Sequence, residues 1–297
     1  MGNEKNSTTS KVSDTDAYAH MLYLSNFLRE PIIPSAIEAL QLPPGSLGLD
    51  AGCGIGSHTL LLAEAVAPAG HVTGLDLSPE FLIHARQIAE RSGLSEQVSF
   101  REGDLNKLPF DDDTFDWVWS VDSLWPGPKE MGCPAEDPVP LVKELARVVK
   151  PEGSVAILFW SSQKLLPGYP LLEARLNTTS QANAPFVKGE KPEIHFLRAL
   201  GWFRNADIEE ARARTFVGDI HPPLSDDVRN ALVSLFEMLW GNAQSEVPPE
   251  DWIEHQRLCQ PESPDFILNL PDYYAFFTYC QRSFKSVPIS VVKSVPV

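Results

Sequence analysis

The chain has 297 residues, of which 43% are hydrophobic and 22% charged, a balance typical of a folded globular protein. Its formal net charge of −16 argues against nucleic acid as a partner, because binding a phosphate backbone draws lysine and arginine into a patch. No stretch reaches the roughly 18 apolar residues of a membrane-spanning helix, so the sequence predicts a soluble, cytoplasmic protein with no membrane partner. The four cysteines show no CxxC spacing, and no metal site is predicted.

The start of the chain differs in character from the rest. Residues 1–14 are polar and lack the apolar core of a signal peptide. We therefore expect residues 1–17 to be a mobile leader and residues 285–297 to be a tail. A single domain is predicted between them, over residues 18–284.

From Leu47 to Trp160 the chain alternates short apolar runs with helix-periodic segments, which is typical of βαβ units. Strands are predicted at residues 47–50, 71–76, around 98–100, 115–122 and 154–160. Helices are expected at residues 57–66, after the N-cap Ser78, and from Pro140, with Gly93 ending the second of them. The sequence therefore predicts an α/β, doubly wound and mostly parallel sheet, with a cofactor-binding core at residues 41–160.

The second half of the chain is less regular. We expect a long connection at residues 161–190, a helix at 191–203, a sixth strand at 211–220 and a late, aromatic strand at 273–284. Residues 222–272 contain a helix capped by Ser225 and a shorter helix at 252–259. This pattern predicts a seven-stranded sheet with a helical insertion between strands six and seven.

Glycines gather where the first strand turns into a helix, in Asp50-Ala51-Gly52-Cys53-Gly54-Ile55-Gly56. Such glycines let backbone N–H groups approach a ligand at the positive end of a helix dipole. Asp76 ends the next strand, where a carboxylate can accept two hydrogen bonds from ribose hydroxyls. The order of strand, loop, helix, strand and acid predicts a site for a ribose-containing ligand.

The ligand does not fit the common phosphate-binding patterns. The dinucleotide pattern would require glycine at position 57 or 59, which are Ser57 and Thr59, and no Gly-Lys-Ser/Thr follows for a P-loop. Asp50 would repel a pyrophosphate but suits a cationic cofactor, and Asp104 is an acceptor for an adenine amino group. Three carboxylates favour a positively charged nucleoside, and S-adenosyl-L-methionine has this chemistry.

The sequence resembles the class I S-adenosylmethionine-dependent methyltransferases, in particular the small-molecule group that includes quinone-biosynthesis C-methyltransferases. The motifs that carry the resemblance are, in chain order, Gly48–Gly56, Val72–Ser78, Gly103–Leu105, Phe115–Ser120 and Glu144–Gly153. The chain departs from the family members with Asn-Pro-Pro-Tyr/Phe after strand four, which methylate amino groups of nucleic acids and glutamine, because Ser120–Pro126 stands there.

The resemblance implies roles for particular residues. Asp76 would bind the ribose with Leu77 beside it, Asp104 would contact adenine through its side chain and Leu105 through its backbone, and the backbone near Ser120 would hold the methionine ammonium. With the glycine loop, the expected cofactor-binding residues are Asp50, Gly52, Gly54, Gly56, Asp76, Leu77, Asp104, Leu105 and Ser120.

The methyl acceptor would lie beyond the carboxyl ends of the strands. Candidate catalytic residues there are Asp122, which would orient an acceptor, and His221, whose imidazole can act as a general base near neutral pH. Each residue also has a non-catalytic interpretation: Asp122 could be a solvated carboxylate at the rim, and His221 could be a loop histidine before two prolines. Trp125 and Trp160 would form a face for the acceptor or simply pack, and residues 222–272 are the expected lid.

We therefore interpret the chain as a methyltransferase that acts on a small organic molecule. Three alternatives stay open: an enzyme of the same fold with another reaction, a non-catalytic regulatory module that binds the cofactor, and, less well matched by the glycines, a nicotinamide dehydrogenase. A metalloid-methylating enzyme would need thiolates such as Cys133 and Cys259, which lack metal-ligand spacing. The acceptor, the acceptor atom and the oligomeric state stay open.

Overall fold

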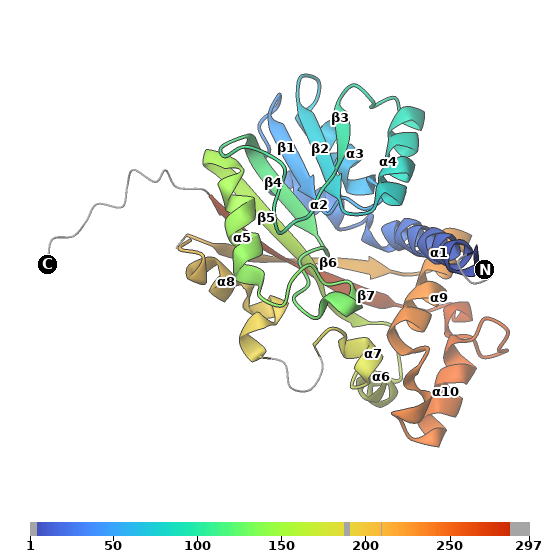
Figure 1. Cartoon of the computed structure of the whole chain (residues 1–297). Helices are drawn as coiled ribbons and strands as arrows, with labels where there is room; N and C mark the ends of the chain where they lie inside the picture. Colours follow the sequence, from blue (N-terminus) through green and yellow to red (C-terminus); the bar gives the residue numbers. More distant parts are fainter. Residues whose placement is uncertain (1–4, 187–190, 209, 286–297) are drawn as a thin grey trace, which may run out of the picture. The chain divides into compact units, whose positions relative to one another are not determined.

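Seven β-strands form one sheet in the computed structural model of the chain, in the order β3-β2-β1-β4-β5-β7-β6 (Figure 1). The structure describes residues 5–186, 191–208 and 210–285. The strands are β1 (Leu47–Ala51), β2 (His71–Asp76), β3 (Val98–Glu102), β4 (Phe115–Val121), β5 (Val149–Lys164), β6 (Arg212–Ile220) and β7 (Ala275–Lys285). Strand β1 pairs in parallel with β2 and β4, and the pairs β2–β3 and β4–β5 are also parallel. The prediction of a mostly parallel, seven-stranded sheet is confirmed.

Helices separate most of the strands along the chain. They are α1 (Lys5–Arg29), α2 (Ile33–Glu38), α3 (Ser57–Val66), α4 (Pro79–Arg91), α5 (Pro138–Arg147), α6 (Pro170–Leu176), α7 (Ser180–Asn183), α8 (Ala199–Asn205), α9 (Asp226–Trp240) and α10 (Pro249–Cys259). None of the helices in the described part of the chain combines the length and the apolar character that crossing a bilayer requires.

The chain divides into two compact units, and it passes from one to the other within β5, β6 and β7. Unit 1 comprises Met1–Pro34, Ser161–Gly189 and Val217–Thr278. Unit 2 comprises Ser35–Trp160, Glu190–Phe216 and Tyr279–Val297. The glycine loop lies in unit 2, and the helical insertion lies in unit 1.

Local sequence signals determine the first half of unit 2. The Ser78 hydroxyl accepts a hydrogen bond from the Phe81 N–H and so caps α4, while Gly93 follows that helix with φ +70°. Trp117 of β4 is buried and donates from its indole N–H to the Ser46 hydroxyl at 2.8 Å. A Cβ at Gly48 on the neighbouring β1 would overlap the Trp117 ring, so the absence of a side chain there makes room for the indole.

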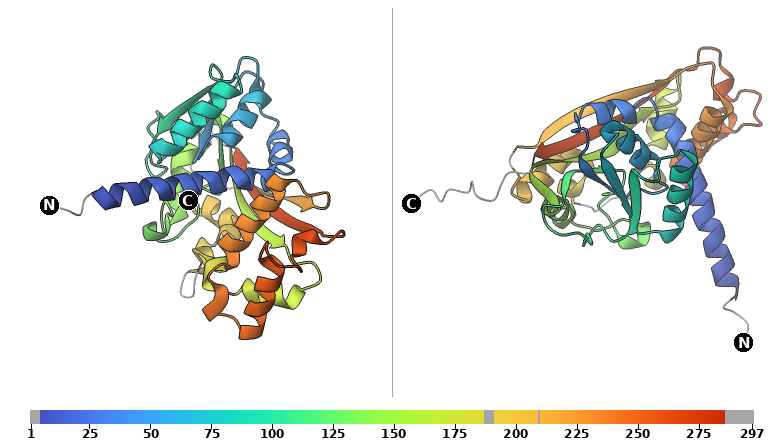
Figure 2. Two further views of the ribbon diagram at one scale, coloured as in Figure 1. Left: turned by 90° about the vertical axis from the view of Figure 1, so that its right-hand side faces the viewer. Right: turned by 90° about the horizontal axis from the view of Figure 1, so that it is seen from above.

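Helices build most of unit 1, where α1 packs along α9 (Figures 1 and 2). The helices are joined by polar contacts between segments that lie far apart in the chain. Arg175 of α6 forms a bidentate pair with Asp251 of α10, at 2.9 and 3.0 Å. The indole N–H of Trp240 in α9 donates to the Asn177 side chain at 3.0 Å.

The boundaries of helix α5 and strand β5 differ from the prediction, the first because of a helix cap and the second because of a β-bulge. Helix α5 begins at Pro138 rather than Pro140, because the Asp137 carboxylate accepts the Val139 N–H and caps it. Strand β5 is longer than predicted, since the expected turn at residues 151–153 is a bulge within the strand, with Glu152 at φ +68° and a register shift against β4.

Three larger predictions differ from the structure. Residues 5–17, predicted to be part of a leader, form the start of α1. Residues 161–190, predicted to be a connection, contain α6 and α7, and residues 191–203 contain two 3-10 turns before α8 instead of one helix. Of the predicted tail, residues 286–297 lie outside the described residues.

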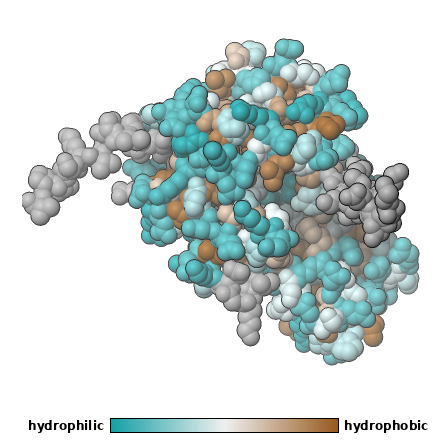
Figure 3. Space-filling view, viewed as in Figure 1, coloured by the Kyte–Doolittle hydropathy of each residue, from teal (hydrophilic) through white to brown (hydrophobic). Residues whose placement is uncertain are grey.

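On the face shown in Figure 3 the surface is largely hydrophilic, and hydrophobic residues are scattered over it.

Candidate functional site

The loop between β1 and α3 is anchored to the next strand through its backbone. The N–H groups of Gly52 and Cys53 both donate to the Leu75 carbonyl of β2, at 2.8 and 2.9 Å. Gly52 and Gly56 adopt φ +81° and +83°, the left-handed region in which glycine is favoured. Gly56 is the N-cap of α3, so the loop leads directly to the positive end of that helix.

Close packing around the loop leaves no room for side chains. A Cβ at Gly52 would overlap the Ser123 side chain, whose hydroxyl donates to the Gly52 carbonyl at 3.0 Å. A Cβ at Gly56 would meet the Ala85 Cβ of α4 at 2.8 Å. The predicted glycine pattern thus coincides with a tight turn whose backbone stays uncovered by its own side chains.

Asp76 connects the glycine loop to the start of α4. One carboxylate oxygen accepts the Gly54 N–H at 2.8 Å, and the other accepts the Ser78 N–H at 2.9 Å. Burial raises the pKa of Asp76 above its ordinary value, although these backbone hydrogen bonds act in the opposite direction. Each carboxylate oxygen has two lone-pair sites, so the group can accept further hydrogen bonds from a ligand.

Asp50 lies beneath the loop rather than at its surface. Only 1% of the residue is exposed, and its carboxylate accepts a hydrogen bond from the Thr59 hydroxyl at 2.7 Å. Burial raises the pKa of Asp50 to about 7, the Thr59 hydrogen bond lowers it, and the nearby Asp76 charge raises it. A cation close to the loop would favour the ionised form of both carboxyl groups.

The other residues predicted to bind a cofactor belong to the same unit. Asp104 is exposed, and one of its oxygens accepts the backbone and side-chain N–H groups of Asn106, at 2.8 and 2.7 Å. Leu77, directly after Asp76, is 68% exposed, which is unusual for a leucine beside a buried strand. Ser120 is fully buried and its hydroxyl donates to the Ala51 carbonyl at 2.7 Å, so its side chain joins β4 to β1.

Asp122 follows the last residue of β4 and is held on both sides of its carboxylate. One oxygen accepts the Trp160 N–H at 2.8 Å, and the other accepts the Tyr279 hydroxyl at 2.6 Å. The backbone of Asp122 has φ +51°, a left-handed conformation that Asp tolerates better than most residues. Asp122 is therefore an oriented and well-partnered group, not a solvated carboxylate at a rim.

The two tryptophans suggested as an acceptor face each pack on other aromatic rings. Trp125 lies edge-on to Phe159 and to Phe196, with ring centroids 5.1 and 4.9 Å apart. Trp160 lies edge-on to Tyr279 at 5.7 Å. An acceptor-binding role for either ring stays a prediction.

His221 belongs to unit 1, whereas Asp122 and the glycine loop belong to unit 2. It directly follows β6, it is exposed, and its Nδ1 lies 3.1 Å from the Pro222 carbonyl oxygen. Its role as a base stays a prediction.

The cysteines show no chemistry of their own. All four are free and buried, and burial raises the pKa of the Cys53 thiol well above its ordinary value. Within residues 5–186, 191–208 and 210–285, the structure contains no cluster of three or more histidine, cysteine or acidic side chains suited to a metal ion.

Sequence reasoning missed three residues that support this region: Thr59, Ser123 and Tyr279. Thr59 lies nine residues after Asp50, on the helix that follows the loop, and a polar side chain on its apolar face was an available sign. Ser123 lies 71 residues from Gly52, and Tyr279 lies 157 residues from Asp122. Nothing in the local sequence links either of these pairs.

Comparison with known proteins gives a consistent result. A family model described as "Methyltransferase domain" matches residues 49–153. Demethylmenaquinone methyltransferase of Bacillus cytotoxicus is 38% identical over 133 residues, which are 45% of this chain and 52% of the relative. Sterol 24-C-methyltransferase ERG6B of Gibberella zeae is 32% identical over 210 residues, 68% of this chain and 53% of the relative. The chain thus spans about half the length of these relatives.

Solved structures agree on the fold. The YcgJ protein from Bacillus subtilis superimposes with a TM-score of 0.51 and 16% identity, covering 86% of this chain and 97% of that one. A candidate methyltransferase from Bacillus halodurans superimposes with a TM-score of 0.50 and 17% identity, covering 86% and 98%. The strand order and these structures show that the chain has the fold of methyltransferases, and residues 49–153 are similar to a methyltransferase domain.

Proposed function

We propose that this protein transfers a methyl group from S-adenosyl-L-methionine to a small organic molecule. The observation that carries the proposal is the glycine loop fastened to Asp76, with the Asp50 carboxyl group buried beneath it. The names of the relatives, one acting on demethylmenaquinone and one on a sterol, support a small organic acceptor.

The residues around the loop fit this cofactor. Gly52, Gly54 and Gly56 would let the backbone approach its methionine part, and the backbone at Ser120 would accept from the ammonium group. Asp76 would accept hydrogen bonds from the ribose hydroxyls through its remaining lone pairs. Leu77 would lie beside the ribose, the Leu105 backbone would contact the adenine, and Asp104 would accept from the adenine amino group.

Bound S-adenosyl-L-methionine supplies a methyl group on a sulfonium cation. The chain would contribute position, exclusion of water and negative charge. The buried Asp50 would supply part of that charge, because a cation near the loop would favour the ionised form of a carboxyl group whose pKa burial raises. This gives the site a preference for a positively charged ligand over a neutral one.

Cofactor affinity should therefore depend on pH through Asp50. With a pKa of about 7 before binding, the group must lose its proton to favour a cation, so affinity should increase roughly tenfold from about pH 6 to about pH 8. Calorimetric titration of S-adenosyl-L-methionine over this range measures the effect. The dependence should disappear in Asp50→Asn and persist in Asp111→Asn, an exposed residue of the same unit; a slope retained in Asp50→Asn would contradict the assignment.

We propose that Asp122 orients the methyl acceptor. In open α/β sheets the reacting groups gather beyond the carboxyl ends of the strands, and Asp122 directly follows β4. The hydrogen bonds from Trp160 and Tyr279 fix the direction of its carboxylate. His221 is a second candidate, as a base for an acceptor that starts protonated.

Asp122→Ala should lower the methyl-transfer rate at least about tenfold and leave cofactor affinity within about twofold, because the change affects only the acceptor side. Tyr279→Phe should lower the rate less, since it removes one orienting hydrogen bond and keeps the ring against Trp160. His221→Asn measures the other candidate in the same assay. Equal losses of rate and cofactor affinity in Asp122→Ala would indicate a structural role instead.

We also propose that the helical segment 222–272 selects the acceptor. It lies outside the part of the chain that the methyltransferase family model covers, residues 49–153. A segment that is not part of the shared cofactor domain is where enzymes of one fold differ in substrate.

Two experiments test the proposed function. Calorimetry with S-adenosyl-L-methionine, S-adenosyl-L-homocysteine and NAD should show binding of the first two and not of the third. Incubation of the chain with a metabolite pool and cofactor labelled in its methyl group should then produce a labelled small molecule. Failure to bind either adenosyl compound would refute the cofactor assignment, and binding without any labelled product would favour a regulatory module.

A further inference from the structure

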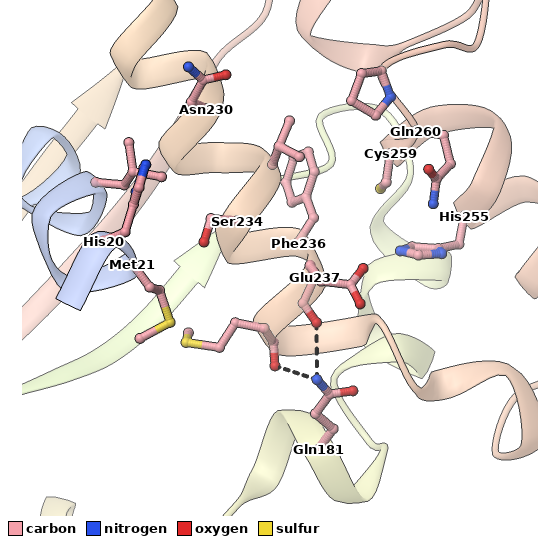
Figure 4. Close-up of a pocket in the computed structure, with 14 residues that line it drawn as sticks. His20, Met21, Gln181, Asn230, Ser234, Phe236, Glu237, His255, Cys259 and Gln260 are labelled. Atoms are coloured by element: carbon pink, nitrogen blue, oxygen red, sulfur yellow. Dashed lines mark hydrogen bonds between the residues drawn. The ribbon is translucent and has the colours of Figure 1, made fainter. Parts of the chain in front are cut away.

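Unit 1 contains a pocket of about 760 Å³ between α1, α7, α9 and α10 (Figure 4). This volume lies within the range of roughly 300 to 1,000 Å³ that is usual for small-molecule sites. Gln181 of α7 fixes one wall, because its side-chain N–H groups donate to the Glu237 and Met238 carbonyls of α9 at 3.0 and 2.8 Å. The apolar part of the lining includes Met21, Leu24, Val233 and Phe236.

One buried polar group in this lining has no partner. His255 of α10 is 3% exposed, and neither of its ring nitrogens has a hydrogen-bond partner among the residues that the structure describes. Both nitrogens have almost no accessible surface, so a molecule in the pocket reaches one of them only when the ring turns toward the cavity. A buried imidazole in a protein core normally finds a donor or an acceptor, and leaving one unpaired is unfavourable by more than an ordinary hydrogen bond is worth.

Aromatic neighbours hold the His255 ring in place. Trp252 stacks on it with centroids 4.8 Å apart, and Trp240 lies edge-on at 6.1 Å. Figure 4 shows the ring projecting from α10 toward α9, on the side where Glu237 lies. The imidazole is therefore a polar group between aromatic rings in the wall of a mostly apolar pocket, and a turn of the ring would bring a nitrogen to the cavity.

The charge state of the lining selects against ions. Burial lowers the pKa of His255 to about 4, so the ring is neutral at pH 7 and offers one N–H donor and one acceptor nitrogen. Burial likewise raises the pKa of Cys259, one helical turn further on, to about 12, which keeps it a thiol. The lining contains no lysine or arginine, and its single carboxylate, Glu237, is exposed.

We propose that this pocket binds a neutral, largely apolar small molecule whose hydroxyl or carbonyl oxygen forms a hydrogen bond with the His255 imidazole. The ligand would supply the partner that the ring lacks, while its apolar body would lie against Leu24, Val233 and Phe236. The proposal does not depend on methyl transfer, since every residue that carries it belongs to unit 1.

Three aromatic probes of similar size test the chemistry: 2-naphthol, naphthalene and 2-naphthoate. Calorimetric titration of the full chain at about pH 7 should show 2-naphthol binding at least about fivefold more tightly than naphthalene, and no measurable binding of 2-naphthoate. His255→Phe keeps an aromatic ring between the tryptophans but removes both nitrogens. It should weaken 2-naphthol about tenfold and leave naphthalene within about twofold.

Two further variants locate the effect. Val233→Trp should narrow the pocket and weaken binding of both uncharged probes at least about fivefold. His71→Phe is the matched control, because it replaces a histidine of unit 2 and should change nothing. Equal affinities for 2-naphthol and naphthalene, unchanged 2-naphthol binding in His255→Phe, tight binding of 2-naphthoate, or no binding of any probe would each overturn the proposal.

A measurement on the unmodified chain covers the case in which His255→Phe fails to fold. In an NMR spectrum of the chain with 15N-labelled histidines, 2-naphthol should change the chemical shifts of the ring nitrogens of one neutral imidazole. Naphthalene, which cannot form a hydrogen bond, should leave these chemical shifts unchanged. Loss of that signal in His255→Gln assigns it. A spectrum in which 2-naphthol leaves this imidazole unchanged would overturn the proposal without any pocket variant.

Discussion

Replacing Asp76 by alanine is expected to weaken S-adenosyl-L-methionine binding at least about hundredfold. The substitution removes two things: the carboxylate that would accept hydrogen bonds from the ribose hydroxyls, and the hydrogen bonds that anchor the glycine loop. Hydrogen bonds to a charged group contribute about 1.5 to 3 kcal/mol each, so losing two of them is sufficient for a change of this size. In addition, the N–H groups of Gly54 and Ser78 would lose the carboxylate oxygens that they now contact at 2.8 and 2.9 Å.

Asp76→Asn separates the two parts. Its amide oxygen can still accept one of the backbone N–H groups, but its NH2 group cannot accept from ribose or from the backbone. We expect its affinity to lie between that of the unmodified chain and that of Asp76→Ala. Asp111→Ala, in the exposed turn of the same unit, is the control and should bind normally.

The readout is the dissociation constant from calorimetry, with thermal unfolding measured for each variant in the absence of cofactor. If Asp76→Ala stays as stable as Asp111→Ala and its affinity stays within about twofold of the unmodified chain, the ribose assignment is wrong. If it unfolds instead, Asp76→Asn carries the test, because it keeps the shape of the side chain.

The first half of unit 2 is predictable because its signals are local. Ser78 is followed by Pro79 and caps α4 through a hydrogen bond to the Phe81 N–H, three residues away. Similarly, Asp76 and Gly54 are only 22 residues apart and lie at the ends of neighbouring parallel strands. The order of motifs along the chain therefore translates directly into a site.

Unit 1 was harder to predict because its helices depend on distant partners. Helix α6 lies in a Pro-, Ser- and Asn-rich stretch whose local sequence favours a connection, yet its buried Glu173 accepts the Leu165 N–H at 2.8 Å. Its Arg175 pairs with Asp251, 76 residues away. Helix α1 is similar, because its polar sequence has weak amphipathic character and it packs along α9.

The same distinction applies within the candidate site. A carboxylate at the end of β4 is visible in the sequence, and this made Asp122 a candidate. Its partner Tyr279 lies 157 residues away, and only the sheet order, with β7 beside β5, places that strand in the neighbourhood. Sequence patterns therefore indicated which groups carry the chemistry, whereas the groups that orient them required the fold.

Replacing Gly52 by alanine should destabilise the chain by about 2 to 4 kcal/mol and weaken cofactor binding about tenfold or more. Two effects add up: a side chain at φ +81° is strained by roughly 1 kcal/mol, and its Cβ would overlap the Ser123 side chain. The backbone would have to move away from Ser123, and the N–H groups of Gly52 and Cys53, which donate to the Leu75 carbonyl, would move with it.

A matched glycine and a compensating change separate these effects. Gly93 has φ +70°, and a Cβ added there would meet no heavy atom within 4 Å, so Gly93→Ala carries only the backbone strain, about 1 kcal/mol, and should leave cofactor affinity unchanged. Gly52→Ala combined with Ser123→Gly removes the overlap, so the double variant should be more stable and bind the cofactor more tightly than Gly52→Ala, with Ser123→Gly alone as reference.

Denaturant unfolding measures the stability of these variants, and calorimetry measures their cofactor affinity. If Gly52→Ala is no more harmful than Gly93→Ala, or if Ser123→Gly restores nothing, close packing is not the reason for glycine at this position, and backbone conformation alone must explain it.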